Sequence, residues 1–199
     1  MATQSQRRAS TREAILNAAQ ELFDRRGFAA TTVDEITAAA DVAKGTFYQH
    51  FETKDEILRA LIRRYQSTSL EDVEKELSSG RAPLQLGASL VTQLGKSCER
   101  HKRSLGQMMS VEMHAPPKKG EPSTREMFAR VFAEAQKRGE IRADVDAYEL
   151  AVIFLGSLLP AMSHWAMAGK KGELINWMEK AWRVFLEGAT CNKKKKRKL

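Results

Sequence analysis

Seven consecutive residues concentrate side chains that could bind a nucleic acid: Lys44, Gly45, Thr46, Phe47, Tyr48, Gln49 and His50. Tyr48, Gln49 and His50 carry hydrogen-bond donors and acceptors of the kinds that proteins use on bases and on the sugar-phosphate backbone. Lys44, at the amino terminus of a helix, would offer positive charge to a phosphate group. Gly45 has no side chain, so the backbone there can approach DNA closely. These residues therefore predict a surface that contacts nucleic acid.

Three predicted helices position these residues. They cover about 11–26 (ended by Gly27), about 33–40 and 44–50, with a tight turn over 41–43. The first carries one apolar stripe at helical spacing, made of Ile15, Ala18, Ala19, Leu22 and Phe23. Phe47 and Phe51, four residues apart, are predicted to hold the third helix against the other two. Two short helices joined by a three-residue turn match a helix-turn-helix, whose second helix lies in the major groove of DNA.

Helix starts are marked by a Ser, Thr or Asp followed three residues later by Glu. The five matches are Ser10/Glu13, Thr32/Glu35, Thr53/Glu56, Ser123/Glu126 and Asp146/Glu149. In each, the first side chain can accept a hydrogen bond from a free backbone N–H group while the Glu reaches back. The pattern predicts a helix start at each of these positions.

The remainder of the chain keeps a helical pattern. Gly80 and Pro83 separate the long helix that Thr53 opens from a fifth helix. Later helices are predicted near 104–114, over 123–139, after Asp146 with an interruption at Pro160, and over 173–187, with a loop over 116–122. The prediction is an all-α fold of about nine helices. It divides into a helix-turn-helix domain over 1–52, a larger helical domain over 53–190 and a basic tail over 191–199.

Three stretches together resemble the DNA-binding domain of the tetracycline-repressor (TetR) family: Thr31 to Ile36, Val42 to Phe51, and Lys54 to Glu56. The resemblance covers 11–62 and implies an all-α homodimer that binds a palindromic operator in double-stranded DNA. It also implies that the domain over 53–190 receives a small ligand, which usually relieves repression. The DNA contacts that it implies are Thr32, Lys44, Gly45, Thr46, Tyr48, Gln49, His50 and Lys54.

Two residues depart from the family pattern. Ala43 stands where the family commonly has Ser, so the third helix lacks a side-chain cap, a loss of about 1 kcal/mol. Asp41 can partly substitute as a turn former. Gln49 stands at a position that is frequently aromatic or His, which changes the expected contact and not its role. Repression is the expected sign of regulation, because nothing in the sequence suggests a surface that contacts polymerase.

Composition favours a soluble protein with a core and argues against an enzyme. Of 199 residues, 42% are hydrophobic and 29% are charged. The net charge of +8 does not itself indicate DNA binding, because the last seven residues carry six positive charges. There is no Gly-rich phosphate loop and no Ser or Cys nucleophile beside a His, so we expect neither catalysis nor a cofactor. An architectural protein that binds DNA without a ligand switch is the other alternative.

The expected location is the cytoplasm. Cys98 and Cys191 do not make a disulfide framework, which fits a reducing compartment. The polar residues 1–12 do not make a signal peptide. Leu150 to Gly169 carry no charge and are long enough to span a membrane, but Pro160 interrupts them within a soluble helical pattern.

The preferred interpretation of the uncharged residues Leu150 to Gly169 is a helix buried in an interface. The helix over about 147–168 is apolar on too many faces for a monomer's surface. Trp177, Ala181 and Val184, in the helix over 173–187, could complete a four-helix seam with a second copy. We therefore predict a homodimer through these two helices, with no membrane involved.

The candidate ligand pocket is a cluster of methionine and phenylalanine side chains: Met108, Met109, Met113, Phe128 and Phe132. Methionine adapts to irregular shapes, so these residues predict a site for a small apolar or aromatic molecule. Plain core packing explains the same cluster equally well.

Three further features each keep two interpretations or more. Cys98 and His101 have a spacing that permits two metal ligands on one helix face, although a buried thiol beside a surface histidine is favoured. Arg7, Arg8 and Arg12 are an ordinary charged terminus or an arm that reaches the DNA backbone. The tail Lys193 to Lys198 has four open interpretations. It is a segment that binds phosphate non-specifically, a segment that resembles a nuclear-localisation signal, an appended segment, or a segment that only adds solubility.

Overall fold

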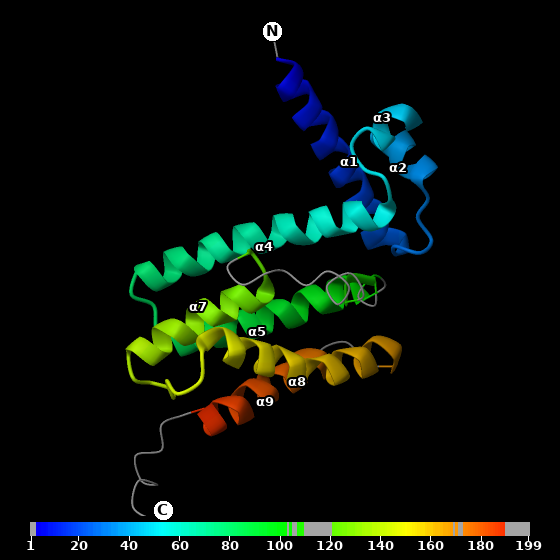
Figure 1. The fold of residues 1–199 in the computed structure, drawn as a ribbon. Helices are drawn as coiled ribbons and strands as arrows, with labels where there is room; N and C mark the ends of the chain where they lie inside the picture. Colours follow the sequence, from blue (N-terminus) through cyan, green and yellow to red (C-terminus); the bar gives the residue numbers. More distant parts are fainter. Residues whose placement is uncertain are drawn as a thin grey trace, which may run out of the picture. The chain divides into compact units, whose positions relative to one another are not determined.

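The protein is described here by a computed structural model that covers residues 3–102, 104, 107–109, 121–168, 170 and 173–189. The helices within these residues are α1 (Gln4–Arg26), α2 (Val33–Ala39), α3 (Lys44–Tyr48), α4 (Lys54–Ser78), α5 (Pro83–Arg100), α7 (Thr124–Lys137), α8 (Ala147–Ala168) and α9 (Glu173–Ala189) (Figure 1). The expected all-α fold is confirmed. The helix predicted near 104–114 and the tail Lys193 to Lys198 lie largely or wholly outside the described residues.

The chain forms two compact units. The first comprises residues 1–65 with 100–116, and the second comprises 66–99 with 117–199. The expected boundary at Thr53 therefore falls inside the first unit. The reason is that the first turns of α4 bury Ile57, Leu58 and Ile62 in the same core as the three preceding helices.

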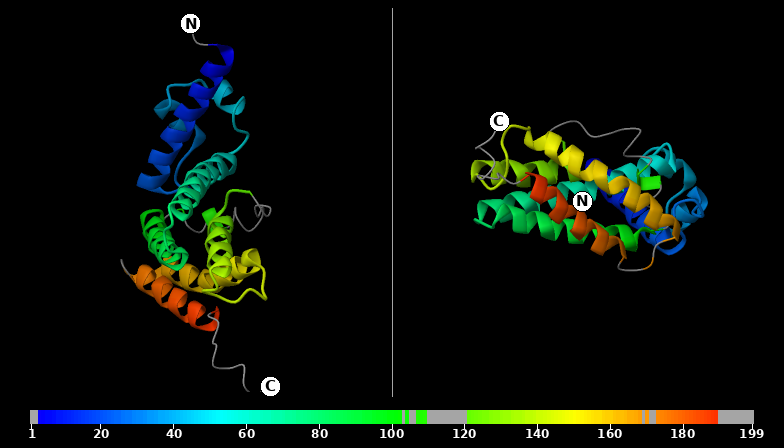
Figure 2. Two further views of the ribbon diagram at one scale, coloured as in Figure 1. Left: turned by 90° about the vertical axis from the view of Figure 1, so that its left-hand side faces the viewer. Right: turned by 90° about the horizontal axis from the view of Figure 1, so that it is seen from below.

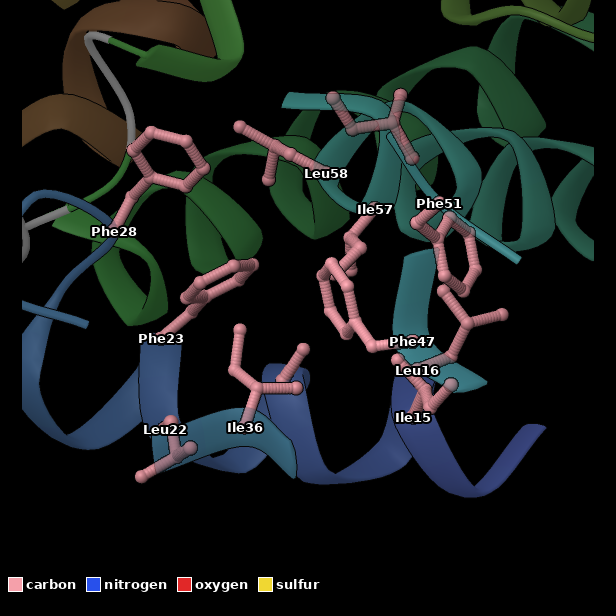
Figure 3. Close-up of a cluster of buried hydrophobic side chains, with 12 residues drawn as sticks. Ile15, Leu16, Leu22, Phe23, Phe28, Ile36, Phe47, Phe51, Ile57 and Leu58 are labelled. Atoms are coloured by element: carbon pink, nitrogen blue, oxygen red, sulfur yellow. The ribbon is translucent and has the colours of Figure 1, made fainter. Parts of the chain in front are cut away.

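The core of the first unit joins one apolar face from each of its helices. Figure 3 shows Ile15 of α1, Ile36 of α2, Phe47 of α3 and Ile57 of α4 converging on one another. All four side chains are fully buried. Burial of each side chain of this size stabilises the fold by about 1.5–3 kcal/mol relative to exposure. This core holds α2 and α3 in a fixed orientation on α1.

The first helix begins seven residues earlier than the sequence predicts. Thr3, not Ser10, caps it: the Thr3 hydroxyl accepts from the Gln6 backbone N–H at 3.2 Å, and the Gln6 side chain accepts from the Thr3 N–H at 2.8 Å. The prediction of a start at Thr11 was wrong because it required Glu at the third position. Gln closes the same reciprocal cap.

The other predicted starts are confirmed. Thr32 caps α2, Thr53 accepts from the Glu56 N–H at the start of α4, and Ser123 accepts from the Glu126 N–H at 3.0 Å. Asp146 accepts from the Tyr148 N–H at 3.0 Å before α8. The capping pattern is local, so it is readable from sequence wherever the residue types match.

The second unit packs α7, α8 and α9 against one another, and Figure 2 shows α8 and α9 side by side. Aromatic rings fill its interior: Phe128, Phe132, Phe154, Trp182 and Phe185 lie with centroids 5.1–6.4 Å apart. Gly87 of α5 allows this packing, because a Cβ atom there would lie 2.5 Å from the Trp182 ring.

The sequence predicts an interruption of α8 at Pro160, and this prediction is wrong. α8 continues through this residue from Ala147 to Ala168. Proline removes the hydrogen bond to the carbonyl of Gly156, four residues earlier. Both residues are exposed in this chain, so water can satisfy the freed carbonyl.

α8 also has an exposed apolar face. Its residues Ala147–Met167 have a mean hydropathy of 1.6, and only 33% of that window is buried. The large apolar side chains exposed on α8 are Val152, Ile153, Leu159 and Met167, and Val184 is exposed on α9. By length and composition alone α8 could cross a membrane, so its exposed face needs an explanation.

Candidate nucleic-acid interface

A short turn sets the orientation of α3. Asp41 adopts a left-handed backbone conformation with φ 52°, which short polar side chains tolerate better than most. The Val42 N–H donates to the Thr37 carbonyl at 3.1 Å. Ala43 occupies the N-cap of α3 and makes no side-chain cap hydrogen bond, as its residue type predicts. The turn therefore depends on Asp41 and on the core beneath α3.

α3 is shorter than the sequence predicts. It spans Lys44–Tyr48, while Gln49 forms its C-cap and His50 lies in the turn that follows. Phe47 is fully buried, and the Tyr48 ring meets it edge-on at 5.3 Å between centroids. Tyr48 is nevertheless 51% exposed. The inner face of α3 thus anchors the helix and its outer face presents Tyr48 to solvent.

Charged side chains around α3 form exposed ion pairs. Lys44 pairs with Asp34 of α2 at 2.6 Å, and this hydrogen bond raises the pKa of Lys44. At the start of α2, hydrogen bonds from the Thr32 backbone and side chain lower the pKa of Glu35, which also contacts Arg26. Exposed pairs of this kind contribute little to stability. The basic side chains of these pairs remain exposed to solvent, where an anion can reach them.

Gly45 has no steric role inside the domain. A Cβ atom at this position would meet nothing within 4 Å. Any requirement for glycine here must therefore come from a molecule that approaches α3 from outside. This is the arrangement that a close approach of DNA to the backbone needs.

Lys54 differs from the other predicted DNA contacts. Its ammonium group donates to the carbonyls of Phe28 at 2.9 Å and of Thr31 at 2.5 Å. It also lies 4.6 Å from the centre of the Phe28 ring. These contacts tie the first turn of α4 to the loop before α2. The charged group that the family resemblance assigns to phosphate is thus engaged within the first unit.

We predict that Lys54→Met lowers the free energy of unfolding by about 1–3 kcal/mol, because it leaves two partly buried carbonyls without their donor. Chemical denaturation followed by circular dichroism measures this loss. Lys44→Met is the matched control: it removes an exposed lysine and should leave the denaturation midpoint almost unchanged. Equal midpoints for Lys54→Met and the unmodified chain would contradict the structural role.

His101, Ser104 and Gln107, which the sequence assigns to the second domain, belong to the first unit. His101 Nδ1 lies 2.7 Å from the Asp24 carboxylate, and the Ser104 hydroxyl accepts from the Phe28 N–H at 3.1 Å. Gln107 donates to Asp55 at 2.5 Å. Sequence reasoning missed these contacts, because no local pattern links residues 50 to 80 positions apart.

The predicted ligand-pocket residues that the structure describes belong to two different units. Met108 packs against the core of the first unit. Met109 belongs to the same unit. Phe128 and Phe132 are fully buried in the second unit and contact each other with centroids 6.2 Å apart. Met113 lies outside the described residues.

Cys98 and His101 have different surroundings. Burial raises the pKa of the Cys98 thiol to about 12. His101 contacts Asp24. Within the described part of the chain, no three His, Cys, Asp or Glu side chains gather as a metal site.

The comparisons with known proteins agree with this geometry. The family model described as bacterial regulatory proteins, tetR family, matches residues 15–61, which include α2, α3 and the start of α4. The HTH-type transcriptional regulator UidR of Escherichia coli (strain K12) is 28% identical over 148 residues, which cover 68% of this chain and 71% of UidR. The HTH-type transcriptional repressor BepR of Brucella suis biovar 1 is 29% identical over 185 residues, covering 82% and 84%.

A solved structure extends the similarity to both units. Thermus thermophilus FadR, a TetR-family transcriptional repressor crystallised with lauroyl-CoA, matches with a TM-score of 0.73 and 27% identity. The match covers 89% of this chain and 94% of FadR. These relatives are transcriptional regulators and not enzymes.

Proposed function

Because this chain is a TetR-family transcriptional regulator, we propose that it represses transcription as a cytoplasmic homodimer on a palindromic DNA operator. A small apolar or aromatic molecule releases it from that operator. The reading surface consists of Thr32, Lys44, Gly45, Thr46, Tyr48, Gln49 and His50, with Lys54 acting beneath it as a positioning residue.

The observation that carries the proposal is the exposed outer face of α3 on a rigid base. Phe47 anchors the helix in the core while Tyr48 stays half exposed and Gly45 faces open space. A preorganised polar surface of this size contacts only a few base pairs, so two copies are needed to specify a long site. An inverted repeat is the operator that a symmetric dimer requires.

The exposed apolar face of α8 supports the homodimer. Val152, Ile153, Leu159 and Met167 are 41–81% exposed in the single chain. A face of this kind, continued by Val184 of α9, is covered when the same two helices of a second copy pack on it. Coverage by a second copy also explains the hydropathy of α8 without a membrane.

The ligand is assigned to the second unit. Its interior is filled by an aromatic cluster that includes Phe128 and Phe132, and apolar surroundings of this kind suit an acyl chain or an aromatic ring. The FadR complex with lauroyl-CoA makes this compound the first probe. α4 runs unbroken from Lys54 to Ser78 and contributes residues to both units, so it is the element that can transmit ligand binding to the reading surface.

Selection from random double-stranded DNA should yield an inverted repeat, and an active ligand should weaken binding to it. A coupling of about 1–3 kcal/mol lowers operator affinity about five- to 150-fold. Operator titrations with and without lauroyl-CoA measure this factor, and calorimetry on free and operator-bound protein measures the reciprocal one.

Linkage makes the two factors equal. A ligand that free and operator-bound protein hold equally tightly would contradict the switch, although the DNA-binding assignment would stand. Recovery of no preferred DNA sequence at all would contradict the assignment itself. Binding to an operator without response to any apolar probe would favour an architectural protein.

A further inference from the structure

The basic residues of the helix-turn-helix region fall into two classes. Arg25 pairs with Glu21, Arg26 pairs with Glu35, and Lys44 pairs with Asp34. The other basic residues before position 52 are Arg7, Arg8 and Arg12, which form no ion pair with any carboxylate of the described residues. All three are exposed on the first turns of α1. Positive charge that is not neutralised is therefore concentrated at this end of the first unit.

Two of these arginines lie beside the end of the reading surface. The Arg12 guanidinium sits 4.9 Å from the centre of the Phe51 ring. Burial, and then the positive charges of Arg8 and Arg12, lower the pKa of His50. Phe51 directly follows His50 in the chain, so the contact of Arg12 with Phe51 places this guanidinium beside the end of the reading surface. We call Arg8 and Arg12 the α1 cation pair.

The α1 cation pair is held on an ordered helix. The reciprocal cap between Thr3 and Gln6 starts α1 two turns before Arg12. Arg8 and Arg12 are four residues apart, so they lie on one face about 6 Å apart along the axis. Like charges at this spacing destabilise a helix by a few tenths of a kcal/mol. An anion bound between them would remove that repulsion.

We propose that the α1 cation pair binds a phosphate of the DNA backbone next to the base pairs that α3 contacts. This inference rests on the proposed DNA-binding function and extends its footprint beyond the residues of the helix-turn-helix. Arginine suits a phosphate because its planar fork donates two parallel hydrogen bonds. The arginines are already placed by α1, so little additional ordering of the chain is needed on binding. Residues 1–52 contain six basic and seven acidic side chains, so their net charge does not indicate this local phosphate site.

The test is the salt dependence of operator binding for Arg8→Gln/Arg12→Gln in the full chain. Each lost phosphate contact reduces the log–log slope by about 0.9, so the double variant should lose up to about 1.8 from the slope. Its affinity at 0.1 M salt should decrease by tens-fold. Arg8→Lys/Arg12→Lys keeps both charges and should keep most of the slope.

Arg59→Gln/Arg63→Gln is the matched control, because these exposed arginines have the same four-residue spacing on α4 and no carboxylate partner among the described residues. Its slope should equal that of the unmodified protein. Equal losses in both double variants would show an effect of net charge alone and overturn the site. Arg8→Gln alone keeps the Arg12–Phe51 contact, so it separates phosphate binding from any loss of stability.

A second measurement needs no DNA. NMR titration should show a higher pKa for His50 in Arg8→Gln/Arg12→Gln than in the unmodified chain, because two nearby positive charges are gone. An unchanged His50 pKa would place the pair away from the reading surface and overturn the inference. If the unmodified protein prefers its operator but the double variant keeps the full slope, this site is wrong and the proposed function stands. If the unmodified protein prefers no sequence, the proposed function is wrong.

Discussion

Replacement of Lys44, Tyr48 and His50 together by alanine is expected to abolish operator binding while the fold stays intact. A good contact to a base edge contributes about 1–3 kcal/mol. Loss of the contacts from Tyr48 and His50 alone should therefore cost about 2–6 kcal/mol and weaken binding about thirtyfold or more. Loss of Lys44 removes a phosphate contact. The slope of log operator affinity against log salt concentration should therefore decrease by about 0.9.

The fold should tolerate this triple substitution. Tyr48 is 51% exposed, and the Lys44 pair with Asp34 lies in solvent. The core beneath α3 depends on Phe47 and Phe51, which are unchanged. Circular dichroism and the denaturation midpoint should match those of the unmodified chain, while fluorescence anisotropy with labelled operator reports the binding loss.

Tyr65→Ala/Lys75→Ala provides the matched control. Tyr65 is 50% exposed, almost the same fraction as Tyr48, and Lys75 forms an exposed pair with Asp72 as Lys44 does with Asp34. This control should bind operator normally. A soluble triple variant that retains full operator affinity would remove α3 from the reading surface and contradict the function argued from it.

Local signals account for what the sequence predicted well. The spacing of apolar residues in α1, the Thr32 cap and the inward pair Phe47 and Phe51 each depend on residues within a few positions of one another. Such patterns are readable because helix geometry fixes which neighbours share a face. The early start of α1 escaped prediction only because Gln6 replaces the usual Glu in the cap.

Contacts between residues far apart in the chain could not be predicted from the sequence. The sequence does not reveal that Lys54 donates to carbonyls more than twenty positions earlier, or that Ser104 accepts from Phe28. Met108, Phe128 and Phe132 have similar side chains, yet Met108 packs in the first unit and the phenylalanines in the second. Residue type alone indicates that a side chain is buried and does not indicate against what.

Ile153→Asp is expected to convert a homodimer into a monomer with little operator affinity. Ile153 is 57% exposed at the middle of the apolar face of α8, where a second copy would cover it. Burial of an unpaired carboxylate in such a seam costs several kcal/mol. A cost of about 3 kcal/mol raises the dimer dissociation constant about 150-fold. Sedimentation velocity at micromolar concentration measures the change in mass.

The control introduces the same charge elsewhere. Gln85→Asp places a carboxylate on an exposed position of α5 and should leave a dimer. Val184→Asp, on the exposed face of α9, should weaken the dimer as Ile153→Asp does. An unmodified chain that is a monodisperse monomer, or that dissolves only in detergent, would contradict the dimer and revive the membrane interpretation of α8.

Protein concentration separates this defect from a defect in the reading surface. A monomer presents one copy of α3 and cannot span two half-sites about one helical turn, 34–36 Å, apart. Mass action restores the dimer as the concentration of Ile153→Asp rises, so its operator binding should recover with the square of the monomer concentration. The triple variant at Lys44, Tyr48 and His50 should remain a dimer over the same range, so its operator binding should rise only in proportion to protein concentration. Operator titrations over a hundredfold range of protein therefore assign each loss to assembly through α8 and α9 or to contacts made by α3.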